Sequence, residues 1–269
     1  GGLAGGGEPV QRVVISKRKQ TAVERRTGRE LLRRHELLFE GEPGRVCALN
    51  QNNPCGQCLD CMIYGYAAGG GGAQKSRVIT DDAFSLHDAA QIVSTRTFNA
   101  PFDDSTPYDA ETGKRMTGLG EDEYVRPQAV FLDMETLKDL TADEFRYVLG
   151  NVLRSSRYGA IASRLGKVDN RLLAVIFSDT ELFSNLELVQ ATYDRLAAEG
   201  TLAFPLPKQE VHEAMQAAIP QLLERVVGQV TVMPATEVGA LQKEMGNLYG
   251  DDDAIHPLLV AVGEGYGPQ

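Results

Sequence analysis

The chain has 269 residues, 42% of them hydrophobic, and a formal net charge of −10. A hydrophobic fraction of this size supports a buried core and excludes a globally disordered chain. No apolar run approaches the roughly 18–20 residues that a membrane-spanning helix requires, and no charged-then-apolar signal peptide is present. Residues 1–7 are mostly Gly and resemble a linker, so we expect a truncated start.

Positive charge is concentrated in one part of this acidic chain. Between Gln11 and Arg34 there are nine basic residues and two acidic ones, whereas from Thr201 to the end there are three basic and nine acidic ones. A polyanion responds to the local field of a protein and not to its net charge. The distribution therefore permits RNA or DNA binding at a basic face, and it predicts that the acidic end repels the same polymer.

The first third of the chain is predicted to hold one strand and one helix. Residues 12–15 form a short strand-like run, and residues 21–39 have helical spacing, with Thr27 as a candidate cap and Glu30 three residues later. Residues 65–72 include five Gly. That composition predicts a flexible loop without helix or strand.

A long projecting hairpin is predicted in the middle of the chain. Residues 78–80, 91–98 and 125–132 read as strands, and residues 100–126 turn to Pro, Asp, Thr and Gly. A polar excursion of this length inside a compact domain is unusual and points to a functional element.

The second half is predicted to alternate helices and strands. Residues 141–153 form an amphipathic helix with Thr141 at the cap and Glu144 at the third helical position. The remaining elements are a buried strand at 172–177, a helix at 185–198 closed by Gly200, a helix at 211–227 interrupted by Pro220, and a strand at 230–233. We interpret 251–253, three Asp, as a solvated loop. The irregular alternation predicts a single α+β domain over residues 1–269 with a mostly antiparallel sheet.

The four cysteines give the sharpest chemical signal. Cys47, Cys55, Cys58 and Cys61 follow the spacing Cys-x7-Cys-x2-Cys-x2-Cys, and a Cys-x2-Cys turn lets two thiolates converge on a tetrahedral ion at ~2.3 Å each. Four thiolates leave no open position, so we expect a structural Zn²⁺ site in a reducing cytoplasm. The alternatives are free or disulfide-bonded thiols, His35 as a substitute ligand, and an iron–sulfur cluster.

The segment 69–76 nearly spells a phosphate-binding loop. That motif needs Gly directly before its Lys, where this chain has Gln74 before Lys75, so we reject nucleotide hydrolysis here. Backbone amides beside Lys75 and Arg77 could still contact a nucleic-acid phosphate. A plain disordered loop is the alternative.

Two further basic stretches favour RNA contact. Residues 154–167 hold four cations (Arg154, Arg157, Arg164 and Lys167), three Ser and Tyr158, without any acid. Such residues neutralise phosphate, donate to its oxygens and stack on bases. The alternative is a solvated helix end whose cations satisfy the dipole. Lys17, Arg18 and Lys19, with Arg25 and Arg26, make a second basic stripe.

Catalytic patterns are poor. Four His are scattered without a nearby nucleophile and base. The pairs Asp81–Asp82 and Asp103–Asp104 could hold Mg²⁺, but paired acids in turns are more often turn formers.

Several strings of residues resemble the backbone subunit of type I-D CRISPR Cascade. The resemblance runs from about Lys17 to about Leu196 and rests on residues 17–21, 27–32, 58–66, 72–80, 95–99, 131–137, 157–160 and 177–188. It implies a modified RNA-recognition-motif (ferredoxin-like) palm, with a zinc-binding finger inserted at 44–77 and a β-hairpin thumb at 99–127. It also implies an antiviral role in which copies polymerise into a filament along one CRISPR RNA.

The resemblance also guides the expected partners and contacts. The partners are CRISPR RNA, target DNA or RNA paired to that guide, neighbouring copies, and the large, repeat-handle and small Cascade subunits, with no membrane. The expected RNA contacts are Lys17, Arg18, Lys19, Arg26, Arg29, Gln74, Lys75, Ser76, Arg77, Arg96, Arg154, Arg157, Tyr158, Arg164 and Lys167.

We expect no enzymatic activity. Two alternatives remain open. One is a backbone endonuclease that cuts target RNA with a thumb-base aspartate, for which Asp103, Asp104 and Asp133 are candidates. The other is a free-standing zinc-ribbon module that binds nucleic acid without a guide.

Overall fold

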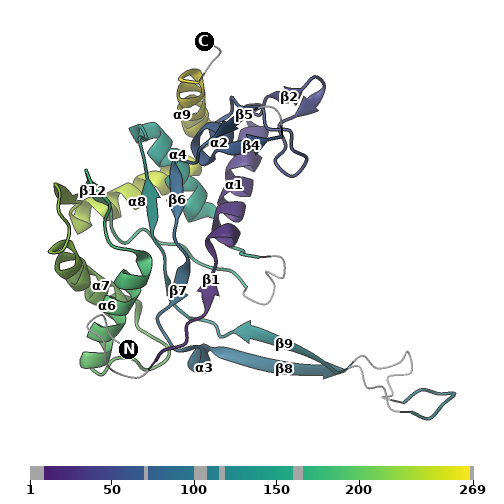
Figure 1. Ribbon diagram of the computed structural model, residues 1–269, viewed down its shortest axis with the longest axis vertical. Coiled ribbons are helices and arrows are strands. Elements are labelled where there is room, and N and C mark those ends of the chain that lie inside the picture. Colours follow the sequence, from purple (N-terminus) through teal and green to yellow (C-terminus); the bar gives the residue numbers. More distant parts are fainter. Residues whose placement is uncertain (1–8, 70–71, 100–107, 115–118, 160–165, 267–269) are drawn as a thin grey trace.

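Figure 1 shows the computed structural model, which describes residues 9–69, 72–99, 108–114, 119–159 and 166–266. A three-stranded antiparallel sheet lies near the middle. Its central strand β7 (Ala83–Ser85) pairs with β1 (Val14–Ile15) on one side and β10 (Phe131–Leu132) on the other. Next to it, β6 (Val78–Thr80) pairs with β11 (Glu135–Leu137). The α+β class with antiparallel sheets is confirmed, whereas the RNA-recognition-motif palm stays a prediction.

The first helix, α1 (Lys17–Arg34), starts earlier than predicted. Ser16 is its N-cap and Thr27 lies in the helix interior, so the candidate cap at Thr27 is wrong. The helix begins before the predicted residue 21 and ends before the predicted residue 39. The helix extends toward the N-terminus because Val23, Leu31 and Leu32 share one buried face. Its exposed side carries six of the basic residues into solvent, namely Lys17, Arg18, Lys19, Arg26, Arg33 and Arg34.

The projecting hairpin consists of β8 (Val93–Asn99) and β9 (Leu119–Val125), paired in continuous register from Val93↔Val125 to Asn99↔Leu119. A short helix, α3 (Ala89–Ile92), precedes it. Figure 1 shows the hairpin extending away from the body of the molecule. The predicted second strand at 125–132 is wrong: β9 ends at residue 125, and β10 starts afresh at residue 131 in the central sheet.

The cysteine region is built from small elements. Strands β2 (Glu40–Glu42) and β3 (Arg45–Val46) pair, α2 (Leu59–Tyr64) follows, and β4 (Tyr66–Ala68) pairs with β5 (Gly72–Gln74). The predicted loop at 65–72 is therefore wrong in part, because residues 66–68 form β4 and Gly72 begins β5. Gly65, at φ +78°, allows the sharp exit from α2.

The second half departs further from expectation. Helix α4 (Ala142–Arg154) has the predicted Thr141–Glu144 capping box, and α6 (Asn185–Ala198) has the predicted bounds. Helix α7 (Lys208–Leu223) continues through Pro220, since buried Ile219 and Leu222 hold its last turn against the core. The strand predicted at 172–177 shrinks to β12 (Ile176–Ser178), paired with β13 (Val230–Val232).

Two C-terminal helices were not predicted. They are α8 (Ala235–Tyr249) and α9 (Asp252–Glu264), and the three Asp interpreted as a solvated loop start α9, with Asp251 as its N-cap. Only Val238 and Met245 of α8 are buried, so the helical pattern was weak. Within the described residues, no helix has the length and apolarity that crossing a membrane requires.

Three groups of buried side chains form the core. One lies under β7 and β10 with α6 and α7, and a small one joins Ile15, Val23 and Tyr158. The third joins the cysteine region to α1, α4 and α9. The predicted finger therefore has no separate core, and its metal-ligand residues are part of a main core.

Candidate metal centre and basic surface

Four cysteine sulfurs come together at one point. The Sγ atoms of Cys47, Cys55, Cys58 and Cys61 all lie within 4.8 Å of one another, and Cys47 Sγ is 3.5 Å from Cys61 Sγ and 4.0 Å from Cys58 Sγ. Thiolates held at ~2.3 Å around a tetrahedral zinc ion are about 3.8 Å apart. All four cysteines are free, and sulfurs this close leave room for one ion between them and not for the several irons of a cluster. Donor set and spacing fit structural zinc.

The local fold positions these sulfurs. Cys47 follows β3, Cys58 is the N-cap of α2, and Cys61 lies in the first turn of that helix. The backbone amides of Cys55 and Cys58 donate to the sulfurs of Cys47 and Cys55 at 3.2 Å and 3.3 Å. Hydrogen bonds from amides favour the thiolate form that binds metal.

The four thiols cannot ionise together without a cation. The pKa of Cys47 lies well below its ordinary value, because the thiols of Cys55, Cys58 and Cys61 donate to its sulfur. The pKa values of Cys58 and Cys61 lie well above the ordinary value of a thiol. Their hydrogen bonds to the sulfurs of Cys47 and Cys55 are the main cause, and burial adds to the effect, so a further thiolate is disfavoured. A bound divalent ion would relieve this repulsion.

Buried ion pairs join the cysteine cluster to α1. Asp60, fully buried in α2, accepts hydrogen bonds from Arg25 Nε at 2.9 Å, Arg25 Nη2 at 2.8 Å and Arg29 Nη1 at 2.9 Å. Arg29 Nη1 also lies 3.4 Å from Cys47 Sγ, and Nη2 donates to the Cys47 carbonyl. Arg29 was predicted to contact RNA. The structure gives it protein partners instead, because its side chain is buried.

Sequence reasoning missed the role of Asp60. The available signal was a carboxylate between two predicted ligands, Cys58 and Cys61, with two arginines four residues apart on the preceding helix. His35, considered as a substitute ligand, is not part of the cysteine group. It ends α1, and its Nδ1 lies 3.2 Å from Nδ1 of His256 in α9, so two of the four His interpreted as scattered are in contact.

Two basic segments that are far apart in sequence lie side by side. A Cβ placed on Gly159 would lie 3.5 Å from Lys19 Cδ, and Tyr158 packs in the same core group as Ile15 and Val23. We call the exposed cations of these segments the basic surface: Lys17, Arg18, Lys19, Arg157 and Lys167.

The side chains of the basic surface face solvent, while the Asp82 carboxylate accepts from the backbone amide of Lys17 at 2.7 Å. Within the described part of the chain, none of its five side chains forms an ion pair with a carboxylate. Unpaired cations keep their full attraction for phosphate. Tyr158, predicted as a contact, is 8% exposed, so its ring serves the core and is not available to stack on a base. Arg164 lies outside the described residues.

The other predicted contacts are placed differently. Arg77 turns inward and pairs with Glu144 at 2.6 Å, so it fixes the start of α4. Lys75 is exposed, whereas Gln74 and Ser76 are half-buried. Exposed Arg26 lies on α1 without an ion-pair partner among the described residues.

Two predicted cations have aromatic partners. The Arg96 guanidinium on β8 lies 5.1 Å from the ring centre of Tyr124 across the hairpin, and that of Arg154 at the end of α4 lies 5.2 Å from the ring of Tyr249. Cation–π contact orients both guanidinium groups without neutralising their charge.

A group of acids lies near the start of α1. Glu24 is 1% exposed, and burial, above all, raises its pKa to about 7. Desolvation also raises the pKa of Asp133 to about 7 and that of Glu135 well above its ordinary value. Within the described ranges, no set of three carboxylates or histidines is close enough to hold a metal ion. Asp103 and Asp104, the other nuclease candidates, lie outside those ranges.

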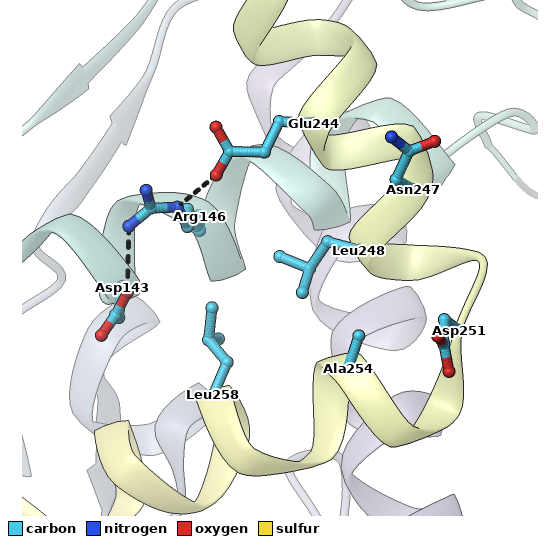
Figure 2. A pocket seen from close by; sticks show the side chains of 8 residues that line it. All are labelled: Asp143, Arg146, Glu244, Asn247, Leu248, Asp251, Ala254 and Leu258. Carbon is cyan, nitrogen blue, oxygen red and sulfur yellow. Dashed lines mark hydrogen bonds and ion pairs between the residues drawn. The ribbon is translucent and has the colours of Figure 1, made fainter.

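A cavity of about 440 Å³ lies between α4, α8 and α9. Figure 2 shows Arg146 between Asp143 and Glu244, each at 3.0 Å, with Leu248 pointing into the space. Asp251 adds a third carboxylate to the lining. The lining of this cavity has three carboxylates and one cation, so its net charge is negative and it repels phosphate. The cavity is therefore not an extension of the basic surface.

The structure thus combines an α+β fold, four clustered cysteine sulfurs that could hold a metal ion, and a group of exposed cations that have no ion-pair partner among the described residues. The family model described as "Csc2 Crispr" matches residues 2–259, so the chain belongs to the Csc2 CRISPR family. The predicted resemblance is confirmed at this level. No curated protein matches the chain.

A solved structure supports the same fold. The crystal structure of Thermofilum pendens Csc2 is similar with a TM-score of 0.52 and 20% sequence identity, covering 98% of this chain and 84% of that one. At this identity the likeness concerns the fold alone. It extends the resemblance over the C-terminal region, including α8 and α9, where the sequence strings gave no match.

Proposed function

We propose that this chain is the CRISPR-RNA-binding backbone subunit of a type I-D Cascade complex in antiviral defence. The observation that carries the proposal is the basic surface: a Csc2-family chain with a net charge of −10 keeps together five exposed cations that have no ion-pair partner among the residues the structure describes. Cations without carboxylate partners suit the regularly spaced phosphates of an RNA strand. Bases then stay free to pair, so sequence specificity belongs to the guide.

The β8–β9 hairpin fits the role of the thumb. It projects from the body in Figure 1 and starts directly after α3. Its paired stretch places Glu121 and Glu123 on one face, opposite Thr97 and Thr95. Side chains alternate between the two faces of a strand. The other face carries Arg96 with Asp122 directly across the strand pair, so one carboxylate there is offset by one cation. We assign RNA contact to the face of Arg96, because the face of Glu121 and Glu123 is the more acidic of the two.

Salt dependence tests RNA binding. We expect affinity for generic single-stranded RNA to fall steeply with salt, with a slope of roughly −0.7 per phosphate contact. The double change Lys17→Glu and Lys19→Glu should weaken binding and flatten that slope. The matched control reverses Arg225 and Lys243, two exposed cations of the C-terminal region, and should leave both unchanged. A flat salt response of the unaltered protein contradicts the proposal.

Neighbouring copies would meet head to tail, which gives an open filament. The C-terminal third is acidic and the N-terminal part is basic, so the two could attract each other between neighbouring copies. The cavity of Figure 2 lies in the acidic region and is lined by both carboxylates and apolar side chains. Charge reversal at Glu210 and Glu213 should weaken assembly on a long guide RNA, measured by sedimentation. Assembly that is unchanged counts against this contact.

The chain is proposed to be structural and not catalytic. The support is membership of the Csc2 CRISPR family, because the resemblance to a Cascade backbone subunit implies that a separate subunit is the nuclease. The test is to incubate the assembled complex with labelled complementary RNA and Mg²⁺. Intact RNA is the expected result, whereas cuts at regular spacing would establish the endonuclease alternative.

A further inference from the structure

The metal centre and the RNA-contacting helix share one side chain. Arg29 is on α1, the helix whose first turn carries Lys17 and Lys19, yet its guanidinium touches a predicted metal ligand. It reaches both the sulfur and the carbonyl of Cys47. No other described cation contacts a cysteine sulfur.

Asp60 fixes this guanidinium. Its carboxylate is fully buried and accepts from Arg29 Nη1 at 2.9 Å and from two nitrogens of Arg25 at 2.8 and 2.9 Å. Because a planar fork held on a carboxylate cannot rotate freely, the Nη1 donor stays directed toward Cys47. Asp60 lies between Cys58 and Cys61, so the same turn supplies two ligands and the group that orients Arg29.

Charge explains why such a contact belongs here. A divalent ion held by four thiolates keeps two excess negative charges, and buried Asp60 adds a third. Burying such charge is costly unless it is paired. Arg25 and Arg29 remove two of the three. Arg29 is the one of the pair that hydrogen-bonds to a sulfur, whereas Arg25 hydrogen-bonds to Asp60 and to the carbonyl of Gly65.

We propose that Arg29, held by Asp60, is a positioning residue of the metal centre that links metal occupancy to the placement of α1. With a metal held by the four cysteines, the Cys47 sulfur would remain a thiolate acceptor for Arg29, and that contact would hold the helix. Loss of the metal would loosen α1 and lower the affinity of its exposed cations for RNA. The RNA part rests on the proposed function.

Metal release tests the first link. We use the zinc-loaded full chain and follow transfer of zinc to a chromophoric chelator. Arg29→Met should release zinc roughly 10–100-fold faster, the usual effect of losing a partner that orients a ligand. Arg25→Met should have a smaller effect. Arg26→Met is the matched control, because Arg26 is exposed on the same helix, and it should match the unaltered protein.

Spectroscopy separates this role from simple support of the fold. In cobalt-substituted protein, Arg29→Met should shift the thiolate-to-metal charge-transfer band, whereas a purely structural ion pair would leave it unmoved. If Arg29→Met does not fold, Arg29→Lys is tested in its place. The lysine keeps the positive charge but cannot contact Asp60, the Cys47 sulfur and the Cys47 carbonyl together. Zinc release from this variant should therefore still be faster than from the unaltered protein. Release rates and spectra equal to those of Arg26→Met overturn the proposal.

RNA binding tests the second link. Removing zinc should lower the affinity of the unaltered protein for single-stranded RNA and increase hydrogen exchange along α1. If the zinc-loaded protein does not bind RNA at all, the proposed function fails while the release result stands. If it binds RNA equally well with and without zinc, the link between metal and α1 is overturned while the proposed function stands.

Discussion

At the scale of single residues, Glu24 is the side chain whose burial most clearly lowers the stability of the folded state at neutral pH. It is almost fully buried on α1, and desolvation is the main cause of its raised pKa of about 7, with the charge of Asp133 adding to it. The folded state therefore holds the proton to higher pH than the unfolded chain, whose ordinary value is 4.5. Stability is greatest below that value and falls as pH rises to about 7.

Replacing Glu24 by a neutral residue should remove this loss of stability with rising pH. We expect Glu24→Gln to be more stable than the unaltered protein at pH 8, by about 1–3 kcal/mol, and to differ little at pH 4.5. Urea unfolding at the two pH values measures this. Glu30→Gln, an exposed acid on the same helix, is the control. An equal pH dependence in both variants would mean that Glu24 does not carry the effect.

Cys58 and Cys61 test the metal centre most simply. Metal analysis of the purified protein should find about one zinc per chain. Cys58→Ala should abolish binding and lower the melting temperature, because the remaining sulfurs cannot complete the tetrahedron and the cluster is part of a main core. Gln57→Ala, an exposed neighbour, should retain the metal. Unchanged metal content in Cys58→Ala refutes the site.

The role of a residue could be predicted from sequence where it depends on the spacing of nearby residues. It could not be predicted where it depends on a partner from a distant part of the chain. Three closely spaced Cys converge because one turn brings them together, so the ligands were found. Arg29 and Arg77 read as surface cations because their partners, Asp60 and Glu144, come from other helices. Charge composition alone cannot separate a cation that faces RNA from one that faces a buried carboxylate.

At the scale of elements, local capping signals were dependable and hydrophobic runs were not. Thr141 and Glu144 form the predicted capping box because both partners lie within one turn. The run 172–177 is apolar, yet it yields only the short strand β12, because most of it packs without a strand partner. Helix α8 escaped prediction because its buried face is only two residues wide.

The crossing of α1 and α4 gives an element-scale prediction. A Cβ on Gly28 would lie 2.5 Å from both the Tyr147 hydroxyl and the Asn151 amide. Gly28→Ala should therefore cost roughly 1–3 kcal/mol through overpacking. The matched control, Gly239→Ala in α8, has no neighbour within 4 Å and should gain up to about 1 kcal/mol from helix propensity. Chemical unfolding measures both, and effects of the same sign would contradict this view of the crossing.

At the scale of the whole molecule, the arrangement of charge matters more than its sum. The basic surface gathers Lys17 and Arg157 from segments that are distant in sequence, and the shared core group around Tyr158 holds them together. The acids dominate the C-terminal region and line the cavity of Figure 2. Under the proposed function, the basic end of the chain would hold a phosphate backbone and the acidic end would repel it.

The RNA that the protein carries tests the central claim most directly. The complex is purified from cells that express the protein at its natural level, and the bound RNA is extracted and sequenced. We expect short RNAs that begin and end in CRISPR-repeat sequence and contain one spacer each. Recovery of no RNA, or of random cellular fragments without enrichment for CRISPR transcripts, would contradict the account.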